Sequence, residues 1–240
     1  MSHATSTPTV RGTAKRTGIS LAVVIGAVVL AGLVYVGVTI AFGDLGEHRV
    51  VVDLLATDIS FLLVGLAFLR WSGAQPITVD RPTASDLRVG GFALVVAVLA
   101  EGTRQVLVAL TAVGAGGTVP ASETIGFGAA LAMIAMMVLV APPVEEFLFR
   151  GVIQRYVRDV SSTKVGIAVA TLLFVPIHAL GILMTAVNAS GVIALVGTLV
   201  VVSVAFGISY ARTDNLIVPI GIHAAYNATT VVIGIVVASV

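Results

Sequence analysis

Cysteine is absent from this chain of 240 residues, and charged residues are scarce. The absence of cysteine excludes disulfides, thiolate metal sites and a thiol nucleophile. Charged residues make up 10% of the chain and hydrophobic residues 58%, whereas soluble domains carry about 25% charged residues. So few polar side chains cannot cover a water-soluble fold. The composition therefore excludes an ordinary soluble domain, and a net charge of +1 gives no reason to expect a nucleic-acid partner.

Long apolar runs account for most of the sequence. Stretches of about 20 apolar residues, the length that crosses the hydrocarbon core of a bilayer, recur along the whole chain. They predict an all-α, polytopic transmembrane helix bundle. We expect about seven helices (seven to eight), at 18–42, 51–71, 87–113, 125–157, 164–183, 190–210 and 215–238. The fourth of these is too long for a simple span.

The placement of lysine and arginine predicts how the bundle lies in the membrane. With a cytoplasmic N-terminus, only Arg49 of the 13 basic residues falls outside, and Arg104 lies within a span. Cytoplasmic loops are the ones that carry excess Lys and Arg, so the predicted topology is N-in and C-out. The other basic residues all fall on the inner side: Arg11, Lys15, Arg16, Arg70, Arg81, Arg88, Arg150, Arg155, Arg158, Lys164 and Arg212.

The distribution of polar groups divides the chain into three parts. Residues 1–17 are polar, basic and rich in Ser and Thr, which predicts a disordered cytoplasmic tail. The apolar run 19–42 is much longer than the core of a signal peptide, so it predicts a retained first helix. Residues 18–120 form the first three helices, with few polar groups inside the membrane, and residues 121–240 form a second transmembrane domain that concentrates them.

Ionisable side chains within hydrocarbon are costly, so each one is a candidate functional residue. Glu101 and Arg104 stand three residues apart and can pair on one helix face, which favours a structural ion pair. Asp53 and Asp58 fall near the outer end of the second helix, where solvation at the interface is cheap. We interpret these four residues as non-catalytic.

A second group of charges follows seventeen uncharged residues, in the sequence PPVEEFLFRG at 142–151. Its two prolines predict a kink or a restart of the fourth helix, which frees backbone groups and opens a polar pocket. Glu146 and Arg150 are four residues apart with the acid first, the favoured spacing for a helical ion pair. Glu145 is turned by about 100° from Glu146, so Arg150 cannot serve both carboxylates equally. One glutamate is left to face a cavity as a general base, unless the group is only an ion-pair cluster at the inner boundary.

Two later segments add histidines to the same half of the chain. Phe174 and His178 stand four residues apart on the fifth helix, and His223 and Asn227 share one face of the seventh. A lone histidine in a membrane helix is often only a packing residue. Glutamate, two histidines and an amide together, however, are groups that can activate water and stabilise an oxyanion.

These three motifs, in this order, resemble those of the type II CAAX prenyl endopeptidases and their bacteriocin-processing, self-immunity and archaeal relatives. Their shared intramembrane domain is also called the CPBP or abortive-infection domain. EExxxR is matched at 145–150, FxxxH at 174–178 and HxxxN at 223–227. The resemblance covers roughly residues 128–235, which makes 121–240 the expected catalytic domain. EExxxR alone would be a weak signal, but three ordered motifs on successive hydrophobic segments are a strong one.

The resemblance implies an intramembrane endopeptidase that hydrolyses a peptide bond of a membrane-associated protein or peptide. By this resemblance, Glu145 would deprotonate the attacking water and His178 would help to position it. His223 and Asn227 would form the oxyanion site. The first three helices match nothing specific, so the resemblance does not name the substrate.

Glu146 and Arg150 would, by the same resemblance, fix the geometry of the site. The need for a metal stays open at this point. Glu145, His178 and His223 form a plausible set of ligands for Zn²⁺ or another divalent ion. The motif HExxH is absent, however, and the same groups suffice for a glutamate-based reaction. We therefore favour a mechanism with no cofactor.

The resemblance also requires a long fourth helix. If this helix ended at Arg150, Glu145 would lie at the inner surface and His178 would lie roughly 20 Å deeper. The two side chains could not then meet. Extending the helix through VIQRYVRDV, residues 152–160, moves Glu145 deeper and resolves the mismatch.

Two functions of other classes remain as alternatives. A proton- or ion-coupled transporter would use Glu and His as a relay, but its polar residues would be spread along a pathway rather than clustered. A non-catalytic scaffold or immunity protein would bind another membrane protein. The compact chain and the lack of a targeting sequence suggest the cytoplasmic membrane of a prokaryote or archaeon, with bilayer lipid and a membrane-associated peptide or protein as partners.

Overall fold

The computed structural model describes residues 9–111, 126–183 and 189–238, and these residues are mostly helical, with no strand among them. Seven helical segments were predicted, and the described residues form seven. They are α1 (Val10–Phe42), α2 (Arg49–Ser72, preceded by a 3₁₀ turn at Gly46–His48), α3 (Ala84–Thr111), one continuous segment from Phe127 to Arg158, α7 (Thr163–Leu183), α8 (Ala189–Thr213) and α9 (Ile217–Ala238). The prediction of an all-α bundle is confirmed.

Five of these segments are long and apolar enough to cross a membrane by length and composition. They are Val10–Phe42, Gly46–Ser72, Phe127–Arg158, Gly191–Thr213 and Ile217–Val236. The apolar stretch Thr163–Ala179 of α7 is shorter than these five. The protein is therefore a multi-pass integral membrane protein, as its composition predicts.

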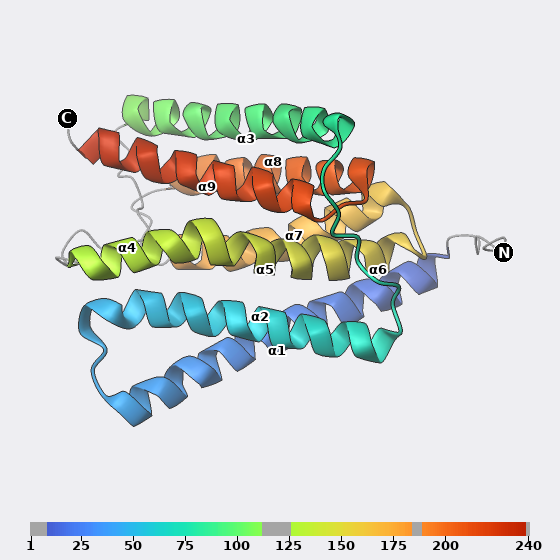
Figure 1. The fold of residues 1–240 in the computed structure, drawn as a ribbon, viewed down its shortest axis with the longest axis horizontal. Helices are drawn as coiled ribbons and strands as arrows, with labels where there is room; N and C mark the ends of the chain where they lie inside the picture. The colour runs from blue at the N-terminus through green and yellow to red at the C-terminus, as the bar shows by residue number, and fades with distance from the viewer. Residues whose placement is uncertain (1–8, 112–125, 184–188, 239–240) are drawn as a thin grey trace.

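The bundle is arranged around the long segment from Phe127 to Arg158. It consists of α4 (Phe127–Ala135), η2 (Met136–Val140), α5 (Ala141–Glu146), η3 (Phe147–Gln154) and α6 (Arg155–Arg158). Helices α1 and α2 pack together on one side of it, and α8, α9 and α3 lie on the other, with α7 between η3 and α8 (Figure 1). Helix α1 begins at one end of the bundle and α9 ends at the opposite end (Figure 1).

Helix α1 begins earlier than the sequence predicts. Residues 10–17 are helical rather than disordered, while residues 1–8 of the predicted tail lie outside the described part. The side chain of Thr9 caps the helix by accepting a hydrogen bond from the Gly12 amide at 3.1 Å. One turn further on, the Arg16 guanidinium lies 4.3 Å from the centre of the Tyr156 ring and 3.7 Å from the carboxylate of Asp159. A cap and a distant partner thus order a segment that is polar in composition.

The core next to the long segment is aromatic. The ring of Phe149 contacts Phe61 on α2 and Phe174 on α7, both edge to face, with ring centres 6.1 and 5.1 Å apart. Helix α2 approaches closely at Gly65, where an added Cβ would lie 2.6 Å from the Phe147 ring. A second cluster of buried apolar residues joins α3, α8 and α9. The two cores hold the polar residues of the long segment between them.

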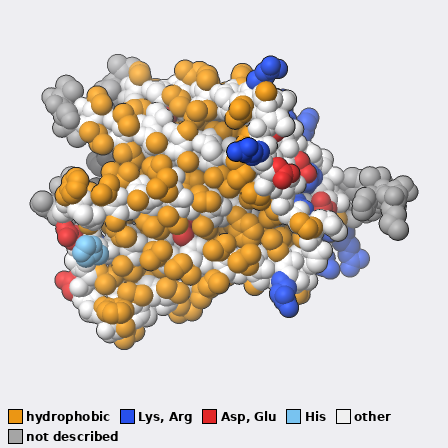
Figure 2. Space-filling view, in the orientation of Figure 1, with side chains coloured by type: hydrophobic (Ala, Val, Ile, Leu, Met, Phe, Trp, Pro, Cys, Tyr) orange, Lys and Arg blue, Asp and Glu red, His pale blue; other side chains and the backbone are white. Residues whose placement is uncertain are grey.

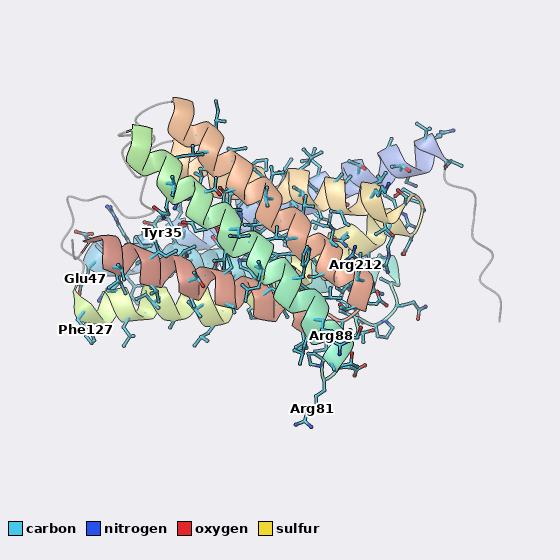
Figure 3. The ribbon with its side chains drawn as sticks, turned by 90° about the horizontal axis from the view of Figure 1, so that it is seen from above. Tyr35, Glu47, Arg81, Arg88, Phe127 and Arg212 are labelled. Carbon is cyan, nitrogen blue, oxygen red and sulfur yellow. The ribbon has the colours of Figure 1, made fainter. Side chains whose placement is uncertain are left out.

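Basic side chains gather at one end of the molecule (Figure 2). Arg81, Arg88 and Arg212 lie toward this end, whereas Glu47 and Phe127 lie at the opposite end (Figure 3). The predicted seven-span topology likewise puts most Lys and Arg residues at one end of the bundle, the cytoplasmic end. The N-in orientation itself stays a prediction, because the structure contains no membrane.

Gly166 on α7 marks a contact that leaves no room for a methyl group. A Cβ added there would lie 2.7 Å from the carbonyl oxygen of Gln154, and the Gln154 side chain is itself bound to the carbonyl of Gly207 at 2.9 Å. We expect Gly166→Ala to lower the free energy of unfolding by about 1–3 kcal/mol, measured by thermal unfolding in detergent. Gly197→Ala on α8, where no described atom lies within 4 Å, is the control. Equal melting temperatures for the two variants would contradict this prediction.

Candidate functional site

The long segment is a single helix with two π-helical stretches, η2 and η3, on either side of α5. It extends to Arg158, so the predicted long fourth helix is confirmed. Its two prolines occupy the first turn of α5 and do not end the helix. A π-helical turn accommodates an extra residue and is frequent at functional sites. The lengthened turns bring Glu145 and Glu146 well inside the bundle, and both are buried.

The prolines leave one backbone carbonyl without its usual partner. The Ala141 amide donates to the Met136 carbonyl, and Pro142, the next residue, has no amide proton to offer Met137. The side chain of Asn227 fills this role, because its Nδ2 donates to the Met137 carbonyl oxygen at 2.7 Å. The freed backbone group that the sequence predicts is therefore satisfied by α9. Asn227 keeps a second N–H for another acceptor.

Glu146 and Arg150 form the predicted ion pair in the middle of the protein. Glu146 Oε2 lies 3.1 Å from Arg150 Nε, and both side chains have no exposed surface. Arg150 also donates from Nη2 to the carbonyl and the hydroxyl of Ser203 on α8, at 3.0 and 3.1 Å. Its guanidinium lies over the rings of Phe174 and Phe206. A buried charge is tolerated when it is paired and hydrogen-bonded in this way.

The second oxygen of Glu146 orients a histidine. His223 Nδ1 donates to Glu146 Oε1 at 2.9 Å, and His223 is buried. Because the carboxylate can only accept, Nδ1 carries a proton and the other ring nitrogen, Nε2, points away from Glu146. Sequence reasoning assigned Glu146 to the geometry of the site but did not identify this contact. Arg150, Glu146 and His223 thus form one connected chain of charge-assisted contacts.

Glu145 faces the opposite way and is not held by Arg150. Its Oε2 lies 3.3 Å from His178 Nε2 and 3.8 Å from His223 Nε2. His178 Nδ1 donates to the Phe174 carbonyl at 3.0 Å, and its ring stacks on Phe174 with the centres 4.0 Å apart. Both histidines are therefore fixed with Nε2 toward Glu145. The atom Glu145 Oε2 is buried without a hydrogen bond to any described residue.

Four elements, α5, η3, α7 and α9, therefore bring five of the predicted residues together: Glu145, Glu146, Arg150, His178 and His223. Asn227 lies one turn from His223 on the same helix. The chemistry of this group is that of a carboxylate beside two oriented imidazoles. Such a group can hold a water molecule, remove its proton and stabilise negative charge.

The fit of a metal ion can be tested on the same residues. Glu145, His178 and His223 are suitable ligand types, and hydrogen bonds on Nδ1 are typical of metal-binding histidines. Among the residues that the structure describes, however, no group of three or more His, Cys, Asp or Glu side chains is placed to hold a metal ion. We therefore route no reaction step through a metal, and the metal-free reaction stays a prediction.

Sequence reasoning missed Asp58, which it placed at a solvated interface. Asp58 is 3% exposed, and its Oδ2 is buried without a hydrogen bond within the described part of the chain. A signal for its burial was available: Asp58, Phe61, Gly65 and Phe68 recur at helical spacing on one face of α2. Asp53, five residues earlier, is exposed.

The second intramembrane pair has the structural character that the sequence predicts. Arg104 donates to both oxygens of Glu101, at 2.9 and 2.6 Å. Tyr226 on α9 adds a hydrogen bond to Glu101 at 3.3 Å. The pair therefore joins α3 to the helix that carries His223 and Asn227.

Residues 127–229 match a family model described as type II CAAX prenyl endopeptidase Rce1-like. The match spans all three motifs, so the resemblance inferred from them is confirmed. No curated protein and no solved structure matches the chain.

Proposed function

Because residues 127–229 belong to the Rce1-like family of type II CAAX prenyl endopeptidases, we propose that this protein is an intramembrane endopeptidase with a glutamate-activated water. At the level of the family, a membrane-embedded peptidase is supported directly. The observation that carries the finer proposal is the position of Glu145. It is the one carboxylate of the EExxxR motif that faces two histidines instead of the arginine.

In the proposed reaction, Glu145 accepts a proton from a water molecule held beside His178. The water oxygen attacks the carbonyl carbon of the scissile peptide bond, whose π electrons move to the carbonyl oxygen. The tetrahedral intermediate then collapses, the C–N bond breaks, and the proton held by Glu145 passes to the leaving nitrogen. The products are one carboxyl and one amine fragment, and Glu145 returns to its starting state.

His223 and Asn227 are placed to stabilise the negative oxygen of that intermediate. For His223 to donate from Nε2 it must carry protons on both ring nitrogens, since Nδ1–H is already bound to Glu146. The Glu146 carboxylate stabilises this imidazolium, and Arg150 holds the carboxylate in place. This division of roles follows the geometry of a carboxylate that orients a histidine in hydrolytic sites. Asn227 can use the N–H that Met137 does not occupy.

The substrate class follows from where the site lies. The carboxylates and histidines are buried within the helix bundle, so the scissile bond belongs to a peptide or protein that is itself associated with the membrane. We place the protein in the cytoplasmic membrane of a prokaryote or archaeon. The family match does not include the first three helices, so it does not say whether the substrate carries a prenyl group.

Cleavage by the purified protein tests the proposal. We expect hydrolysis of quenched fluorescent membrane peptides in detergent, and no loss of rate in a metal chelator, because the proposed reaction uses only Glu145, the two histidines and Asn227. Thermolysin, a zinc enzyme, in the same detergent and chelator is the control for metal removal. A rate that falls with chelator and returns with added Zn²⁺ would overturn the metal-free mechanism.

A liposome assay separates the proposal from its alternatives. A proton-coupled transporter would carry protons across liposomes that contain the protein, whereas a peptidase would not. A scaffold would do neither. Proton flux that depends on Glu145, without peptide cleavage, would favour the transporter over the peptidase.

A further inference from the structure

Three phenylalanines from three helices form a layer across the core. Phe149 of the long segment contacts Phe61 on α2 and Phe174 on α7. Helix α2 and the long segment run in the same direction, whereas α7 runs back along the bundle (Figure 1). Because the three rings lie at one height along the bundle, they serve as a reference for the heights of other residues on the three helices.

One helical turn from this layer, toward the same end of the bundle, stand three polar side chains. Asp58 precedes Phe61 by three residues, Glu145 precedes Phe149 by four, and His178 follows Phe174 by four. Residues three or four apart share a helix face, so each polar side chain lies on the face of its phenylalanine. Helix α2 packs against α5, and Asp58 interacts electrostatically with Glu145. Asp58, Glu145 and His178 therefore form a polar layer beside the aromatic one.

This polar layer contains two carboxylate oxygens that receive no hydrogen bond. His178 Nε2 lies 3.3 Å from Glu145 Oε2, but in the neutral imidazole the proton is on Nδ1, which donates to Phe174. Both Asp58 Oδ2 and Glu145 Oε2 are buried and make no hydrogen bond to the described residues. A buried acceptor without a donor costs free energy, and two adjacent carboxylates add repulsion. A water molecule between them offers one O–H to each and removes both penalties. A buried water of this kind needs at least two polar partners, and the layer supplies them.

We propose that Asp58 completes the water-binding site of the endopeptidase, by accepting a hydrogen bond from the water that Glu145 deprotonates. This inference rests on the proposed function. One proton of the water moves to Glu145 and the other stays on the attacking oxygen, directed toward Asp58. That second contact fixes the rotation of the water, so that its lone pair faces the scissile carbonyl. Asp58 lies outside the matched residues 127–229, which gives α2 a part in the reaction.

The test compares Asp58→Asn with Asp53→Asn, an exposed carboxylate on the same helix. Asparagine keeps the shape of Asp58 but donates from one position, which turns the water away from its reactive orientation. We expect Asp58→Asn to lower kcat at least tenfold with KM changed by less than about threefold. We also expect Tm to rise by about 2 °C or more, because the repulsion between two buried carboxylates is removed. Asp53→Asn should leave both unchanged.

Two further measurements separate this inference from the proposed function. If Glu145→Gln abolishes cleavage but Asp58→Asn keeps the wild-type kcat, the function stands and the role of Asp58 is overturned. If the wild type cleaves no peptide, a double-mutant cycle on Tm decides whether the two carboxylates share one site. Non-additive shifts for Asp58→Asn and Glu145→Gln support the shared water site, and additive shifts overturn it.

Discussion

Glu145→Gln is expected to reduce peptide cleavage by about 10²–10⁴-fold, the contribution of a positioned general base. The amide has the shape of the carboxylate but cannot take a proton from water. The variant should still fold, because Arg150 is paired with Glu146 and not with Glu145. Initial rates on one fluorescent peptide, measured beside the melting temperature, test both halves of this expectation.

Glu47→Gln is the matched control, because Glu47 lies at the far end of the bundle and binds the Gly126 amide at 2.6 Å. It should keep the wild-type rate. A Glu145→Gln variant that is folded and still cleaves at a rate within threefold of wild type would exclude Glu145 as the base. If the same rate fell to zero in Glu146→Gln alone, the roles of the two glutamates would have to be exchanged.

Arg150→Met is expected to cost about 3–5 kcal/mol of stability, because it leaves the fully buried Glu146 carboxylate without its counter-ion. It also removes the two hydrogen bonds to Ser203 that join the long segment to α8. The double variant Glu146→Gln with Arg150→Met should lose less than the single one, since no buried charge is left unpaired. Thermal unfolding in one detergent measures all three proteins.

Arg158→Met provides the control for arginine replacement. Arg158 lies 3.4 Å from Asp214, and both side chains are partly exposed, a setting in which an ion pair contributes about 0–1 kcal/mol. Should Arg150→Met lose no more stability than Arg158→Met, the buried pair would not hold the bundle together. A double variant less stable than Arg150→Met would likewise contradict the proposed reason.

The helices could be predicted because each one corresponds to a contiguous run of apolar residues. The pairing of Arg150 with Glu146 rather than with Glu145 was also predictable, since Arg150 is about one turn from Glu146 and lies off the face of Glu145. Both inferences depend only on residues within one helix. Helical periodicity carries that information without knowledge of the neighbours.

Contacts between helices could not be read in this way. The bond from Asn227 to the Met137 carbonyl joins residues that are 90 positions apart, and the π-helical stretch that presents this carbonyl has no sequence signal of its own. The beginning of α1 was missed because its order depends on Tyr156 and Asp159, far along the chain. Asp58 was judged by its distance from the membrane surface and not by the helix face it shares with Phe61.

The four-residue spacing of Glu146 and Arg150 also affects how the protein is made. Ser203 and His223, their partners on α8 and α9, are synthesised 53 residues after Arg150 and 77 residues after Glu146. While the chain has been synthesised only as far as the long helix, these two charges can pair only with each other. Glu145 gains its imidazole neighbours only after α7 and α9 have been made. The order of the motifs along the chain therefore allows the Glu146–Arg150 pair to form first and the surroundings of Glu145 to be completed last.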